Sequence, residues 1–200
     1  NMNQYTIAII GFLSFGCFLV VVEILSRKLK LSPEWIRRLS HLFAALFTIY
    51  FSFYLEGIFL LTILGIFSAV MLMSRVLKIF NHIHLVSRLT FGEELLSLGF
   101  IAAYLISEGQ MAVFIPSMLI IGFADAITGM VMQRWRKHYL GILTFIIVTI
   151  PILLTFAHVN FVVSFTVALF VAIIERVSPY GTDNFSVPTV TALLLTSIKV

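Results

Sequence analysis

The chain has 200 residues, of which 60% are hydrophobic and only 11% are charged. A soluble domain is typically about 45–50% apolar and about 25% charged, so this composition excludes a water-soluble globule and a disordered chain. The single cysteine, Cys17, excludes a fold held by internal disulfides. The net charge of +4 does not require a nucleic-acid partner, because basic loops on the cytoplasmic side of a membrane protein explain it better.

Eight apolar runs follow one another along the chain, at 5–25, 39–55, 57–74, 94–107, 111–132, 139–157, 161–175 and 185–199. A helix needs ~20 apolar residues to cross a bilayer, and a backbone in lipid must satisfy its own hydrogen bonds. The first run has no basic segment before it, so we expect a retained helix rather than a signal peptide. We predict one all-α transmembrane domain over 1–200, a polytopic bundle with seven or eight spans and short loops.

The basic residues predict the orientation of these spans. If the spans alternate in direction, one side receives all of the lysines and arginines except Lys199, namely Arg27, Lys28, Lys30, Arg37, Arg38, Arg75, Lys78, Arg88, Arg134, Arg136, Lys137 and Arg176. The positive-inside rule then predicts an integral membrane protein with its N-terminus outside and these loops in the cytoplasm. Helical spacing of apolar residues over 75–92 predicts an amphipathic helix along the cytoplasmic interface.

Asp125 is the most unusual residue within an apolar run, because ionisable groups in lipid are costly and mark functional sites. Gly122, Asp125 and Gly129 share one face of the predicted helix. The two glycines leave room for a ligand or for a close neighbouring helix. A functional carboxylate is favoured here over an acid that merely pairs with a buried arginine.

Arg37, Arg38 and His41 lie near the start of the second run, at a spacing that allows them to share a helix face. Two guanidinium groups bind phosphate oxygens bidentately, and an imidazole adds a donor. A topology anchor explains the two arginines equally well. Ser32 and Pro33 just before them are typical of a helix N-terminus.

Three more polar clusters lie on the same side of the predicted spans. Glu93 begins the fourth run, where an acid offsets the helix dipole or binds a metal. Asp183 and Asn184 lie in a turn-forming segment, and Mg²⁺ is commonly held by one or two carboxylates together with substrate phosphates. Lys137 precedes Gly141 where the sixth run begins. Together these groups suit phosphoryl or nucleotidyl transfer to a membrane acceptor.

The order of these clusters resembles the dolichol kinase and phytol kinase family, CTP-dependent lipid kinases related to phosphatidate cytidylyltransferases. The resemblance is carried by Glu23, Arg27, Pro33-Glu34, Arg37-Arg38, His41, Gly92-Glu93, Ser97-Leu98-Gly99, Asp125-Ala126-Ile127-Thr128-Gly129, Glu175, Ser178-Pro179, Gly181, Asp183-Asn184 and Pro188. It runs over most of the chain. The chain departs from the family pattern at Arg38, Ser97, His138 and Ile142, which stand where the family has Lys, Pro and two hydroxyl residues.

The resemblance implies transfer of the γ-phosphate of CTP to the hydroxyl of an isoprenoid alcohol such as dolichol or phytol, with a divalent metal, for which we expect Mg²⁺. It implies nucleotide or phosphate binding by Arg37, Arg38, His41, Gly129, Lys137, Gly141 and Asn184. The implied metal ligands are Asp125, Asp183 and Glu175. The implied catalytic groups are Asp125, Glu93 and His41, with Asp125 as the first choice of base.

Two other functions fit parts of the same pattern. A phosphatidate cytidylyltransferase would use the same nucleotide but release pyrophosphate and form a CDP-lipid. A non-catalytic transporter or scaffold predicts charges near the membrane midplane and two related halves of broken helices. The charges here gather at one end of the runs, and no two halves match.

Overall fold

The computed structural model describes residues 3–29, 32–77, 91–135 and 137–198, and within these ranges every regular element is a helix. The elements are α1 (Gln4–Leu29), α2 (Pro33–Ser52), α3 (Gly57–Val76), α5 (Gly92–Ile106), α6 (Met111–Leu119), the π-helix η1 (Ile120–Ala124), α7 (Asp125–Trp135), α8 (His138–Ile152), the π-helix η2 (Leu153–Ala157), α9 (Phe161–Val177) and α10 (Asp183–Ser197). The predicted all-α class is confirmed for the described residues. The amphipathic helix predicted over 75–92 falls mostly on 78–90, outside them.

Each predicted apolar run corresponds to one helix or to one continuous helical rod. Four of these segments are long and apolar enough to cross a membrane, namely Gln4–Leu25, Gly57–Val76, Met111–Trp135 and Tyr139–Ala157. Counted by length and hydropathy, the described helices therefore give four candidate spans and do not confirm the predicted seven or eight. The physical reasons are that α2 carries arginines in its first turns and that α5, α9 and α10 have only 15, 17 and 15 residues.

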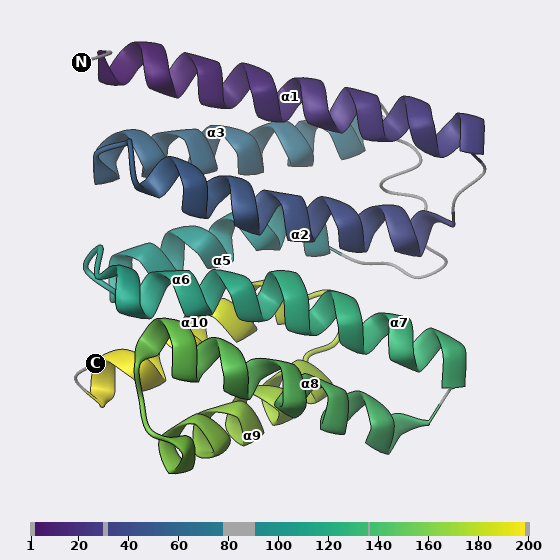
Figure 1. The fold of residues 1–200 in the computed structure, drawn as a ribbon. Coiled ribbons are helices and arrows are strands. Elements are labelled where there is room, and N and C mark those ends of the chain that lie inside the picture. Colours follow the sequence, from purple (N-terminus) through teal and green to yellow (C-terminus); the bar gives the residue numbers. More distant parts are fainter. Residues whose placement is uncertain (1–2, 30–31, 78–90, 136, 199–200) are drawn as a thin grey trace.

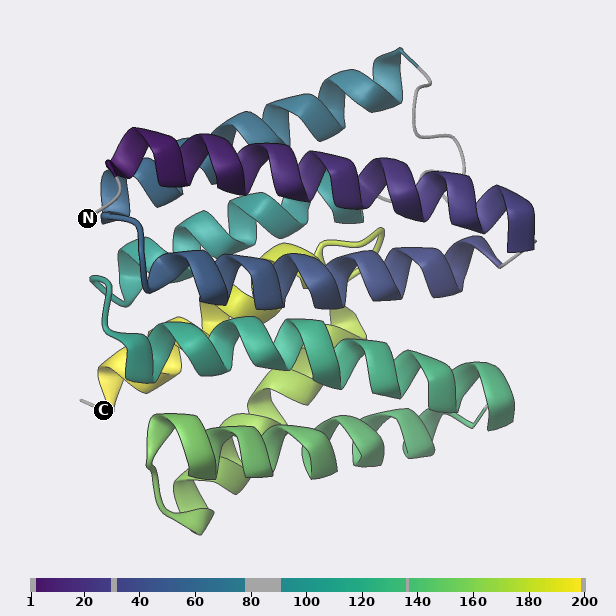
Figure 2. The same cartoon turned by 45° about the horizontal axis from the view of Figure 1, so that its top comes forward.

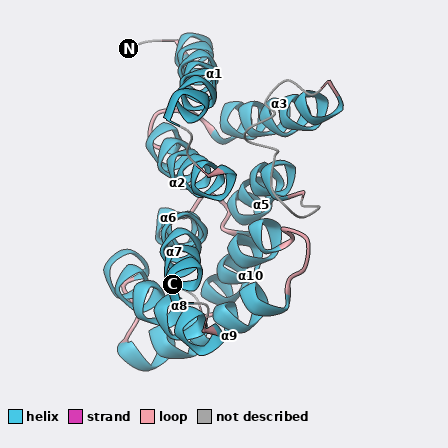
Figure 3. Cartoon of the chain, turned by 90° about the vertical axis from the view of Figure 1, so that its right-hand side faces the viewer, coloured by secondary structure: helices cyan, strands magenta, loops and turns pink. Residues whose placement is uncertain are grey.

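The helices stack in pairs around one buried rod. Figure 3 shows them nearly end-on, with α1 and α3 on one side, then α2 and α5, then α7 and α10, and α8 and α9 on the opposite side. The rod formed by α6, η1 and α7 is the most enclosed, with 72% of its apolar window buried compared with 22% for the window in α1. Helices α1, α3 and α8 instead present apolar side chains outward, as lipid contact requires.

The chain brings several helix termini together at one end of the molecule, where α1 ends, α2 begins, α7 ends and α8 begins (Figures 1 and 2). The starts of α5 and α10 contact each other. The Asn184 side-chain amide donates a hydrogen bond to the Gly92 carbonyl (2.8 Å), and the Phe91 amide donates to the Tyr180 carbonyl (3.0 Å). We call the half of the molecule that contains these termini the polar end, because the charged residues of α2, α3, α5, α9 and α10 lie at them; Asp125 lies at the start of α7, inside the buried rod.

Candidate functional site

Asp125 follows an irregular turn in the buried rod. Pro116 lies inside α6 and has no N–H to donate, and the π-helix η1 begins four residues later. Such π-turns within helices occur frequently at functional sites. Asp125 is the first residue of α7 and its side chain is buried. A side-chain carbon added at Gly122 would lie 2.9 Å from the Ala45 Cβ, so the glycine face permits close packing against α2.

Arg38 from α2 lies directly over Gly129 of α7. Its Nη1 donates to the Ala126 carbonyl at 3.5 Å, and a side-chain carbon added at Gly129 would overlap the guanidinium group. Any residue larger than glycine at this position would therefore move the arginine. The space predicted beside Asp125 is occupied by a cation from the neighbouring helix.

Three carboxyl groups from different helices share this environment, and we call Asp125, Glu175 and Asp183 the acidic cluster. The charges of Asp125 and Asp183 both act on Glu175, near the end of α9, and Arg38 and Arg176 oppose them. Asp183 is buried at the first turn of α10. The structure thus places Asp125, Asp183 and Arg38 within electrostatic range of Glu175.

Asn184 places an amide oxygen next to the acidic cluster. Its Nδ2 is fixed by the Gly92 carbonyl, while its buried Oδ1 has no hydrogen-bond partner among the described residues. No group of three or more His, Cys, Asp or Glu side chains in the described ranges is arranged closely enough to hold a metal by itself. Mg²⁺ needs only one or two carboxylates when phosphates and water supply the remaining oxygens, so the donor set here fits that ion.

Arg37 points to the other side of α2, since successive residues of a helix are about 100° apart. Arg37, His41 and Glu93 line a small pocket between α1, α2, α3 and α5, and they are only 4%, 3% and 5% exposed. The Nε and Nη1 atoms of Arg37 and both ring nitrogens of His41 have no hydrogen-bond partner within the described residues. Buried polar atoms are normally hydrogen-bonded, so these unpaired nitrogens indicate that a ligand binds in the pocket. The structure therefore divides the predicted Arg37, Arg38 and His41 face between two spaces.

Arg75, at the end of α3, fixes the start of α5. Its Nη2 lies 3.0 Å from the Glu93 Oε2, its Nε donates to Glu94, and its guanidinium group lies 5.2 Å from the centroid of the Phe91 ring. Burial raises the pKa of Glu93 and the charge of Glu94 adds to this effect, whereas Arg37 and Arg75 oppose it. Sequence reasoning missed this role of Arg75; the only signal was a basic helix end shortly before an acidic helix start.

The remaining predicted residues lie around this centre. Lys137 is exposed at the start of α8, and the structure shows no contact between it and the acidic cluster. A side-chain carbon added at Gly141 would lie 2.7 Å from the Met132 sulfur, so Gly141 allows α8 to pack closely on α7. Thr128 was missed by the sequence reasoning: it is buried, and its hydroxyl has no partner among the described residues.

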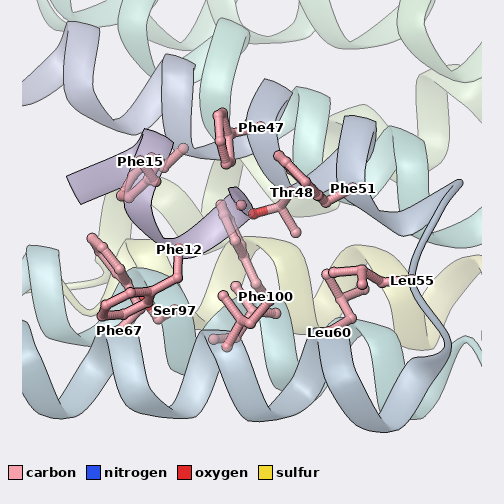
Figure 4. Close-up of a pocket in the computed structure, with 14 residues that line it drawn as sticks. Phe12, Phe15, Phe47, Thr48, Phe51, Leu55, Leu60, Phe67, Ser97 and Phe100 are labelled. Carbon is pink, nitrogen blue, oxygen red and sulfur yellow. The ribbon is translucent and has the colours of Figure 1, made fainter. Parts of the chain in front are cut away.

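An apolar cavity adjoins the pocket of Arg37, His41 and Glu93. It lies between α1, α2, α3 and α5 and has a volume of about 40 Å³. Figure 4 shows Phe12, Phe15 and Phe47 from α1 and α2 around it, with Phe67 and Phe100 from α3 and α5 completing the wall. A pocket lined by charged side chains and a cavity lined by apolar side chains therefore lie next to each other.

Comparison with known proteins gives one informative similarity. No protein-family model matches the chain, and no solved structure matches it. The phytol kinase of Synechocystis sp. is 28% identical over 200 aligned residues, which cover 90% of this chain and 85% of that protein. This distant similarity extends over most of both chains and supports a relationship to phytol-kinase-like proteins.

Proposed function

We propose that this protein is a membrane lipid kinase that transfers the γ-phosphate of CTP to the hydroxyl of an isoprenoid alcohol. The active site would lie at the cytoplasmic face, with the N-terminus outside, as the basic loops predict. The observation that carries the proposal is the convergence of buried cations and carboxylates at the polar end, directly beside an apolar cavity. The similarity to a phytol kinase supports the same conclusion.

The donor side of the proposed site is the region of Arg38 and the acidic cluster, where a guanidinium group and carboxyl groups are within electrostatic range of one another. Arg38 would bind the triphosphate, and one or two carboxylates of the acidic cluster, with the Asn184 Oδ1, would hold Mg²⁺ together with phosphate oxygens. When bound, the ion supplies charge neutralisation for the phosphates.

The acceptor side is the pocket of Arg37, His41 and Glu93. The alcohol oxygen would bond to the γ-phosphorus while the bond between that phosphorus and the β–γ bridging oxygen breaks, and CDP would leave with that oxygen. Glu93, whose raised pKa makes it a stronger base than an ordinary carboxylate, would take the hydroxyl proton. Arg37 and His41, whose buried nitrogens have no partner among the described residues, would orient the alcohol oxygen by donating hydrogen bonds to it.

The proposal is tested with the purified full chain in detergent. CTP labelled at either the α- or the γ-phosphate would be offered with Mg²⁺ and with phytol, farnesol, a long polyprenol or diacylglycerol. We expect γ-label, and no α-label, in a lipid monophosphate. Transfer of α-label into lipid would identify a cytidylyltransferase instead, and label in no lipid with any nucleotide or metal would contradict a lipid kinase.

A further inference from the structure

We infer that the hydrocarbon chain of the acceptor alcohol lies between α1, α2, α3 and α5, with its hydroxyl in the pocket of Arg37, His41 and Glu93. This inference rests on the proposed function and deepens it by assigning the binding place and the orientation of the lipid.

One stripe of α2 connects the polar pocket to the apolar cavity. Arg37, His41, Ala44, Thr48 and Phe51 recur at helical spacing, and all of them line one or both spaces. The stripe is charged at the start of α2 and becomes apolar toward its end. At ~1.5 Å per residue it extends ~21 Å, which is about two-thirds of the ~30 Å hydrocarbon core of a bilayer. Its shape and polarity match a molecule with one polar end and a long apolar tail.

The walls of the cavity favour hydrocarbon over a nucleotide. The cavity is lined by the phenylalanines Phe12, Phe15, Phe47, Phe51, Phe67 and Phe100. Thr48 and Ser97 are the polar side chains that the described lining contains. A base and a ribose require several placed hydrogen-bonding groups, and these walls do not supply them.

The cavity also adjoins a route from the bilayer. It shares Phe15, Ala44 and Phe67 with the polar pocket, and it shares Phe12 and Ile63 with an apolar groove between α1 and α3. The groove has about 640 Å³ of space on the side of the molecule remote from the polar end. A lipid entering there would keep its tail parallel to the helices, as it lies in the membrane.

The test uses a farnesol analogue that carries a photoreactive diazirine near the end of its tail. The full chain in detergent is irradiated with this probe, and the labelled residues are mapped by mass spectrometry. We expect labelling of the cavity walls and displacement of the label by excess phytol but not by CTP. Labelling centred on α8 and α9, or displacement by CTP as effective as that by phytol, would overturn the inference.

A matched pair of substitutions sharpens this test. Ala44→Phe places a ring where the cavity meets the polar pocket, so labelling should fall at least about tenfold. Ala69→Phe adds the same ring on the exposed face of α3 and should leave labelling unchanged. If Ala44→Phe does not elute as a folded species, Ala44→Leu serves as the smaller block. Full labelling of the folded blocked variant would overturn the inference.

Labelling requires no turnover, so the two proposals fail separately. Active enzyme that is labelled outside the cavity would contradict this inference alone. Inactive protein that is labelled inside the cavity would contradict the kinase and leave an isoprenoid-binding site.

Discussion

Arg37 and Arg38 are adjacent in the sequence, but they serve two regions of different character. On the Arg37 side, four helices surround a small polar pocket and an apolar cavity. On the Arg38 side, α7, α9 and α10 bring together three carboxyl groups, and the arginine fills the space over Gly129. The difference indicates how one site can accommodate an apolar alcohol and an anionic nucleotide, with the first turns of α2 bordering both regions.

The two regions also differ in how firmly they are enclosed. The rod that carries Asp125 is 72% buried over its apolar window, whereas the windows of α1 and α3 are each 22% buried. Few buried contacts make local opening easier. We therefore expect α1 and α3 to separate for a lipid tail while the carboxylate side stays fixed.

The largest effect is expected at the acidic cluster. Asp125→Asn keeps the shape of the side chain but removes its charge, so kcat should fall about a thousandfold. The measurement is alcohol phosphorylation by purified protein whose thermal stability matches that of the wild type. Glu56→Gln, at an exposed position at the start of α3, is the control and should retain full activity. If Asp125→Asn retains full turnover, Asp125 is not part of the active site.

The neighbouring acids at the start of α5 should separate function from stability. Glu93→Gln removes the proposed base and should lower kcat about a hundredfold. Glu94 contacts Arg75 and is absent from the lining of the polar pocket, so Glu94→Gln should leave kcat within about twofold of the wild type. Equal losses of kcat in both variants would mean that Glu93 is not the base and has only a structural role.

Gly129→Ala tests whether the packing of Arg38 against Gly129 matters, without changing a charged residue. The added methyl would displace the guanidinium group and should raise the KM for CTP about tenfold. Gly65→Ala is the matched control, because nothing lies within 4 Å of the methyl that it adds. If Arg38 is the cause, Gly129→Ala should add little further effect in an Arg38→Ala background.

The smallest effect is expected at Arg75. Arg75→Met removes two ion pairs and should lower the free energy of unfolding by about 1–3 kcal/mol. Thermal unfolding in detergent measures this loss. The double variant with Glu94→Gln should lose less than the sum of the two single variants. Simple additivity would mean that the pair contributes nothing to stability.

The positions of the helices could be predicted from the sequence, because the length of an apolar run is dictated by the bilayer. The start of α2 at Pro33 also followed from local chemistry. The π-turn η1 was not predictable, since Ile120–Ala124 is apolar whether it forms an α- or a π-helix. The predicted seven or eight spans are not confirmed, because four of the described helical segments are long and apolar enough to cross a membrane and the other apolar runs form shorter or more polar helices.

The residues of the site were easier to predict than their grouping. Asp125 stood out because charges near lipid are rare, while Asp183 stood out in a turn-forming segment and Glu175 followed from the family resemblance. The structure places Asp125 and Asp183 within electrostatic range of Glu175. The spacing of residues along α2 predicted the directions in which Arg37 and Arg38 project from the helix axis. It did not predict which neighbouring helix each arginine faces. That information depends on tertiary packing, which a periodic pattern does not contain.

The most direct test of the account compares Arg37→Ala with Arg38→Ala by steady-state kinetics, varying the alcohol and CTP independently. The account predicts that Arg37→Ala raises the KM for the alcohol and leaves the KM for CTP unchanged, while Arg38→Ala does the reverse. A rise in the KM for CTP in both variants, with the KM for the alcohol unaffected, would mean that both arginines bind the triphosphate. That result would contradict the assignment of the two arginines to different substrates.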